Sequence, residues 1–194
     1  MIKCYLKLFL IVPLFLTGCH RSTAEIRKEK EEATRNFILP LQPKEGKALV
    51  YVIYNKIGLS LPRTMAILCT HIDKERHERL NSFWKNLFVP ADKSSTANLI
   101  AHLKPGEYYG FYLDPGYYEF QHKVAIPTTE RTVPVVETPL GLFLESNKIY
   151  YMVSEWIYFY DLPEGIRFRQ LKDALDGKYY LSNNFHQPIQ KGFI

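Results

Sequence analysis

Histidine side chains are the first candidates for chemistry in this sequence, because a neutral imidazole binds metals and exchanges protons near pH 7. None of them belongs to a pair four residues apart with an adjacent glutamate, the helical arrangement that zinc hydrolases use. His102 and His122 can meet if their strands pair, but the sequence identifies no third ligand for a metal. We therefore expect no metal site and no cofactor from the histidines that follow the N-terminal region: His71, His77, His102, His122 and His186.

Hydrolytic chemistry would need a nucleophile with a base, or a pair of suitably placed carboxylates. The sequence contains neither a G-x-S-x-G elbow nor a glycine-rich phosphate loop. Five acidic residues of the second half lie near predicted strand ends or turns, where solvated carboxylates are expected: Glu107, Asp114, Glu119, Glu155 and Asp161. We find no catalytic set in these patterns and expect that the protein is not an enzyme.

A dense aromatic run lies between positions 108 and 120, where seven of thirteen residues are tyrosine or phenylalanine. Successive side chains of a strand point to opposite faces, so Tyr109 and Phe111 are expected on one face and Tyr108 and Tyr112 on the other. Packing in a core is the favoured interpretation, since aromatic residues are natural strand formers. The candidates for an outward surface that contacts a sugar or a partner protein are Tyr108, Tyr112 and Tyr117.

Two Pro-Gly pairs, Pro105-Gly106 and Pro115-Gly116, bracket this run. Proline presets φ at the second position of a turn and glycine accepts the positive φ at the third, so both pairs predict type II turns. The residues between them are then expected to form the central strand of a meander, paired with the strands before and after it.

The N-terminus carries the signature of export. Lys3 and Lys7 precede an apolar run over residues 8–16, which is too short for a permanent membrane span and has the proportions of a signal peptide. Leu16-Thr17-Gly18-Cys19 follows directly and closely resembles the bacterial lipobox. This resemblance implies cleavage between Gly18 and Cys19, a diacylglyceryl group on the Cys19 thiol, and often a further acyl chain, such as palmitate, on the new amine.

Cysteine usage and charge agree with an exported protein. Cys4 leaves with the signal peptide and Cys19 is expected to carry lipid, so Cys69 remains as a buried small hydrophobe without an internal disulfide. Removing residues 1–18 removes Lys3 and Lys7 and no acid, so 23 of the 25 basic residues face 20 acidic ones, a net charge of +3. That balance is too weak to indicate nucleic-acid binding.

Residues 19–46 predict a tether between the lipid and the domain. Their first half is charged, with pairs at helical spacing, and their second half contains Pro40 and Pro43. We expect a short solvated helix and then an extended piece, which together lift the domain off the membrane without fixing its orientation. His20, in place of an aspartate after Cys19, favours the outer membrane over the inner membrane in a bacterium that has both.

Runs rich in β-branched and aromatic residues dominate the chain beyond position 47. A helix over residues 73–88 is predicted by an apolar stripe with Asp73 as N-cap, and a shorter helix is predicted over residues 171–181. Residues 127–139 contain three prolines and are expected to form a long loop or an edge crossing, and residues 185–194 a loose tail. The expected strands cover residues 48–54, 65–72, 98–103, 108–113, 117–125, 148–160 and 166–170.

The order of these elements resembles a family of bacterial lipoprotein domains catalogued as domain of unknown function number 2846. Pro115-Gly116-Tyr117-Tyr118 and Lys148-Ile149-Tyr150-Tyr151 stand at the positions of its hairpin turn and its later strand. The resemblance spans residues 47–184 and implies a small β-sandwich on a lipid anchor, with no established activity. The expected fold is therefore mainly β, a small antiparallel β-sandwich with an inserted helix and a short C-terminal helix.

The expected function is that of a lipid-anchored protein of the bacterial cell envelope. Its sandwich would act as a non-catalytic interaction module for another envelope protein or polymer, through residues 127–139 or 73–88. The alternative is an envelope glycan-binding protein or hydrolase that uses the tyrosine-rich face.

Overall fold

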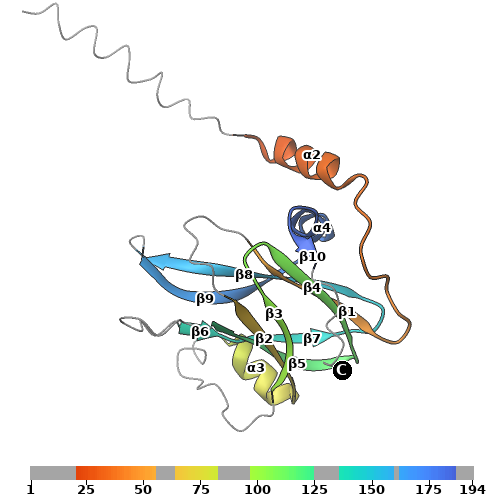
Figure 1. Ribbon diagram of the computed structural model, residues 1–194. Helices are drawn as coiled ribbons and strands as arrows, with labels where there is room; N and C mark the ends of the chain where they lie inside the picture. Colours follow the sequence, from red (N-terminus) through yellow and green to blue (C-terminus); the bar gives the residue numbers. More distant parts are fainter. Residues whose placement is uncertain (1–20, 56–63, 83–96, 125–135, 160–161, 187–194) are drawn as a thin grey trace, which may run out of the picture.

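Two β-sheets packed face to face form the body of the protein in the computed structural model, which describes residues 21–55, 64–82, 97–124, 136–159 and 162–186 (Figure 1). One sheet has six strands in the order β10-β4-β1-β8-β9-β6, and the other has four in the order β3-β2-β5-β7. The strands are β1 (Ala48–Tyr54), β2 (Met65–Ile72), β3 (Asn98–Leu103), β4 (Glu107–Leu113), β5 (Gly116–Val124), β6 (Val136–Thr138), β7 (Leu140–Leu144), β8 (Ile149–Phe159), β9 (Leu162–Leu171) and β10 (Phe185–His186). The helices are α2 (Thr23–Thr34), α3 (Lys74–Asn81) and α4 (Ala174–Ser182).

This architecture confirms the predicted fold, a small and mainly β sandwich with a helix between β2 and β3 and a short helix near the C-terminus. The four-stranded sheet is antiparallel throughout. The six-stranded sheet is mixed, because the pairs β1–β8, β4–β10 and β6–β9 are parallel. The sequence did not predict these parallel pairs, since they join strands far apart along the chain.

β1 lies inside the six-stranded sheet, between β4 and β8. All seven of its residues are buried, as its unbroken apolar sequence predicts for a strand covered on both faces. Val50 and Val52 belong to the core between the two sheets, whereas Leu49, Tyr51 and Ile53 face a second apolar cluster on the outer side. Because successive side chains of β1 point to opposite faces of the sheet, this strand contributes to both apolar clusters.

The predicted meander is wrong, because β4 pairs with β1 and β10 while β3 and β5 belong to the other sheet. The first turn forms as expected: Gly106 has φ +88° and Glu107 N–H donates to the Lys104 carbonyl at 3.0 Å. At the second, Gly116 has φ +157° and already begins β5, so the chain crosses from one sheet to the other there. A turn residue determines only the local change of direction and not which strands pair. β4 pairs with β1, which lies between β4 and β8 in the six-stranded sheet.

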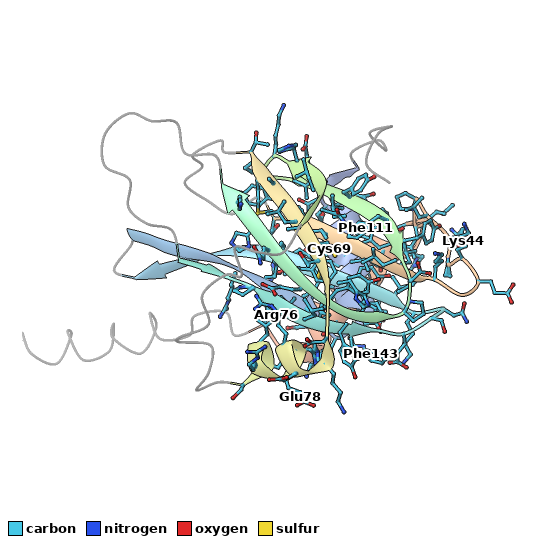
Figure 2. The ribbon with its side chains drawn as sticks, turned by 90° about the horizontal axis from the view of Figure 1, so that it is seen from below. Lys44, Cys69, Arg76, Glu78, Phe111 and Phe143 are labelled. Atoms are coloured by element: carbon cyan, nitrogen blue, oxygen red, sulfur yellow. The ribbon has the colours of Figure 1, made fainter. Side chains whose placement is uncertain are left out.

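α3 packs on the outer face of the four-stranded sheet, where its Arg76 is directed toward the sheet and Glu78 away from it (Figure 2). The Asp73 carboxylate accepts from Arg76 N–H at 2.7 Å, which confirms the predicted N-cap. Arg76 Nε lies 2.5 Å from Glu119 Oε2, and the Glu119 side chain is only 1% exposed. α3 ends at Asn81, well before position 88, and the rest of the predicted helix lies outside the described residues apart from Ser82, its C-cap.

Several other boundaries differ from the expectation. β7 was not expected, β9 begins at Leu162 instead of residue 166, and α4 begins at Ala174 instead of residue 171. Phe185 and His186 pair in parallel with Glu107 and Tyr108 as β10, so the C-terminal tail is not loose at those two residues. β6 falls inside the segment expected as a loop or edge crossing, and it does lie at the edge of the six-stranded sheet. Residues 187–194 and 125–135 are outside the described part of the chain.

The core between the sheets contains Cys69, which is buried and free, as the sequence predicted. Burial raises the pKa of its thiol to about 12, so the group stays protonated and unreactive at neutral pH. Among the residues that the structure describes, no helix is both long and apolar enough to cross a lipid bilayer.

Candidate functional site

The outer face of the six-stranded sheet is lined by tyrosines from three adjacent inner strands, β4, β1 and β8. Tyr51 of β1 stacks on Tyr151 of β8, with ring centroids 5.8 Å apart and planes within 9°. On the other side, Tyr51 meets Tyr108 of β4 edge-on at 6.2 Å. These offset and edge-on arrangements are the favourable ones for aromatic rings, so the three side chains form one rigid layer.

Gly110 makes room for this layer. It lies on β4 between Tyr108 and Tyr112, opposite Tyr51 of β1 in the strand register. A Cβ at position 110 would lie 2.6 Å from Tyr51 Cε1 and 3.0 Å from Leu41 Cδ1. Glycine is therefore required here for the close approach of both side chains.

Gly177 has the same role in α4. A Cβ at this position would lie 2.3 Å from Cγ of Tyr151, inside any allowed contact. The glycine that weakens the helix by propensity thus allows α4 to lie directly on the tyrosine layer. Leu181 of α4 is buried in the same outer cluster.

Residues 37–42, which we call the strap, cover the remainder of this face. Phe37, Leu39 and Leu41 pack against the buried outer cluster, while Ile38 between them is 79% exposed. This alternation is typical of an extended segment with one apolar face. The pattern was readable in the sequence, but Pro40 and Pro43 led to its interpretation as a free tether.

Tyrosine hydroxyls hold the backbone of the strap. The Tyr51 hydroxyl accepts from Leu41 N–H at 3.0 Å and donates to the Leu41 carbonyl at 3.1 Å. The Tyr112 hydroxyl donates to the Gln42 carbonyl at 2.5 Å. Burial raises the pKa of Tyr51 to about 12, so its hydroxyl keeps the proton that it donates.

α2 continues the docked segment toward the N-terminus. Ser22 and Glu25 form a capping box at its start. Lys30 Nζ lies 2.6 Å from Asp176 Oδ1 of α4 and 5.8 Å from the centroid of the Tyr179 ring. The expectation that residues 19–46 leave the domain free to reorient is therefore wrong for residues 23–42, which are held against the domain.

The structure does not bring the three predicted surface tyrosines together. Tyr108 and Tyr112 face the outer cluster of the six-stranded sheet, where Tyr108 is only 3% exposed. Tyr117 lies on the four-stranded sheet, with its ring 4.7 Å from Phe143 and 4.9 Å from His77. Tyr108 is thus a buried member of the tyrosine layer and not a surface contact.

The strands of His102 and His122 do not pair, because β2 lies between them, so the condition for these two histidines to meet is not fulfilled. His102 is exposed, whereas His122 is buried in the core with its ring edge-on to Phe168 at 4.9 Å. Within the described ranges, no group of three or more histidine, cysteine or acidic residues could hold a metal ion. Gly18 and Cys19, the predicted cleavage and lipidation residues, lie outside those ranges.

No protein-family model matches the chain, and no curated protein matches it. The resemblance to domain family 2846 and the lipobox at Cys19 therefore stay predictions.

Proposed function

We propose that the protein is a lipid-anchored component of the bacterial cell envelope whose β-sandwich is a non-catalytic interaction module for another envelope component. The observation that carries this proposal is the docking of α2 and the strap onto the sandwich. An anchor joined to a docked segment holds a domain in one orientation, and a module that presents one face to a partner benefits from this restraint.

The arrangement of the layers supports one orientation of the domain relative to the membrane. α2 contacts α4 on the outer side of the six-stranded sheet, and α3 lies on the opposite side, against the four-stranded sheet (Figure 1). A membrane reached through the N-terminus of α2 would therefore leave α3 and the exposed Phe143 accessible to a partner. Residues 127–139 are the second candidate segment for this contact.

The anchor is tested by metabolic labelling with palmitate. Cys19→Ala is expected to abolish labelling and leave the precursor uncleaved or the protein released from membranes. Cys4→Ala is the matched control, since Cys4 precedes the lipobox and should leave labelling intact. Labelling of the Cys19→Ala variant would refute the anchor.

The interaction is tested by crosslinking in cells from photoreactive residues at Glu78 and at Phe143, both exposed on the α3 side. A specific adduct with one envelope component is expected from at least one of them. The control position is Arg27, an exposed residue of α2. Absence of any specific adduct from both Glu78 and Phe143 would count against an interaction module.

The alternative of a glycan site on the tyrosine-rich face requires the strap to leave. Tyr51 and Tyr108 are buried in the outer cluster that the strap covers, and Leu41 lies against Tyr51 at the Gly110 position. A sugar therefore has no access to these rings while residues 37–42 are docked.

A further inference from the structure

We propose that the tyrosine-lined outer face of the six-stranded sheet is a peptide-binding site whose resident occupant is the strap. The ligand that it would take from a partner is an extended segment with large apolar residues at alternate positions. This inference rests on the proposed role as an interaction module and names the chemistry of the partner for that role.

The strap is bound as peptide ligands are bound, through its main chain and through every second side chain. The Tyr51 hydroxyl binds both polar groups of the Leu41 backbone, and the Tyr112 hydroxyl binds the Gln42 carbonyl. These hydrogen bonds do not depend on the type of side chain and would be offered equally to another extended chain.

Side-chain selectivity comes from the apolar cluster below. Phe37, Leu39 and Leu41 contact it, whereas Ile38 and Pro40 are exposed. Leu41, the last of the three inward residues, can approach the sheet because Gly110 below it has no side chain. The site therefore selects apolar residues at the first, third and fifth positions of an extended segment and is tolerant at the second and fourth.

Release of the strap would break none of the strand pairs of the sandwich. The three inward side chains of the strap are only partly buried, and the strap belongs to neither sheet. α2 is fastened by the pair Lys30–Asp176, whose side chains are 26% and 36% exposed and hence screened by salt. The connection to β1 passes through Gly46, which has φ +74°. A Cβ added at Gly46 would have no atom within 4 Å, so the chain is not packed tightly at this residue.

A partner protein is favoured over a second copy of this chain as the occupant. A strap exchanged between two copies would only repeat the contacts that it already makes within one chain. The intramolecular contact is favoured by an effective concentration on the order of millimolar, which a second copy has no added contact to overcome. A partner segment can overcome it by covering apolar surface that the strap leaves part-exposed.

The test uses the full mature chain, residues 19–194 with Cys19→Ala, and a fluorescent peptide with the sequence of residues 34–43. Leu39→Asp in the protein places a charge against the apolar cluster and should release the strap. The variant is expected to bind the peptide about tenfold or more tightly than the parent chain, because the attached strap no longer competes. Ile38→Asp is the matched control, since that side chain points to solvent and the parent affinity should persist.

Changes in the peptide give a second arm. The peptide with Leu41→Asp should lose binding to the Leu39→Asp protein, and the peptide with Ile38→Asp should keep it. If Leu39→Asp does not fold, Lys30→Glu replaces it, since it repels α2 from Asp176 at a partly exposed position. The parent chain should gain the same affinity for the peptide at high salt, because salt also weakens the pair between Lys30 and Asp176.

Three results would overturn the proposal. The first is a folded Leu39→Asp protein that does not bind the peptide, and the second is binding of peptidoglycan fragments, without the peptide, by that protein. The third is a concentration-dependent dimer of the parent chain that Leu39→Asp abolishes, which would assign the site to a second copy. Because peptide binding is measured without lipid or envelope, its failure is distinct from failure of palmitate labelling or of crosslinking.

Discussion

The hydroxyl of Tyr51 binds the backbone of Leu41 twice, accepting from its N–H at 3.0 Å and donating to its carbonyl at 3.1 Å. One side chain from the middle of a sheet thus satisfies both polar groups of a residue that precedes the first strand. This contact holds the strap, which follows the predicted anchor in the chain, against β1, a strand in which every residue is buried.

Tyr51→Phe removes both hydrogen bonds and leaves two partly buried backbone groups without these partners. We expect the free energy of unfolding to fall by ~1–3 kcal/mol, and the Leu41 amide to lose protection from hydrogen exchange. Tyr150→Phe is the matched control, because the Tyr150 hydroxyl accepts from Glu145 N–H far from the strap. It should leave the protection of Leu41 unchanged, and equal loss in both variants would contradict the assignment.

Gly110→Ala places a Cβ 2.6 Å from the Tyr51 ring and 3.0 Å from Leu41, so the strap or the tyrosine layer must shift. The expected loss of stability is ~1–3 kcal/mol, measured by urea denaturation. In a Tyr51→Leu background, where the ring is absent, the same substitution should be less destabilising. Simple additivity of the two substitutions would show that Gly110 does not accommodate Tyr51.

Arg76→Met leaves the buried Glu119 carboxylate without its closest cation. We expect a loss of ~3–5 kcal/mol in the free energy of unfolding, because an uncompensated buried charge is strongly unfavourable. Lys74→Met is the control on the same helix: its pair with Glu78 is exposed on both sides, and its removal should change stability by less than ~0.5 kcal/mol. Similar effects of the two variants would argue against Arg76 as the fastening of α3.

Alkaline pH should destabilise the protein. Burial raises the pKa of Cys69 from 9.0 to about 12 and that of Tyr51 from 10.0 to about 12. Above pH 9 the unfolded chain loses these protons while the folded chain keeps them. The contribution of these two groups to the free energy of unfolding is therefore complete below pH 9 and falls as pH rises toward 12. Urea denaturation at increasing pH measures this fall. Cys69→Ala should make it shallower at its lower end, and an unchanged slope would contradict the role of the thiol.

The sequence by itself determined several local elements of this protein. β1, β2 and β3 have the predicted bounds, and Asp73 is the predicted N-cap of α3, because alternation and capping depend on neighbours along the chain. The turn at Gly106 was also predicted, since only a positive φ is needed there. The burial of Cys69 followed from its apolar surroundings.

Only the tertiary structure decided which surfaces meet. The partner strands of β4, the place of Tyr117 on the other sheet and the docking of the strap all depend on contacts between distant segments. Phe37, Leu39 and Leu41 carry an alternating pattern, but a pattern states which side is apolar and not what covers it. The tertiary structure shows that these side chains cover the sheet near Gly110 and Tyr51. The space for Leu41 exists there only because β1 and β4 lie side by side.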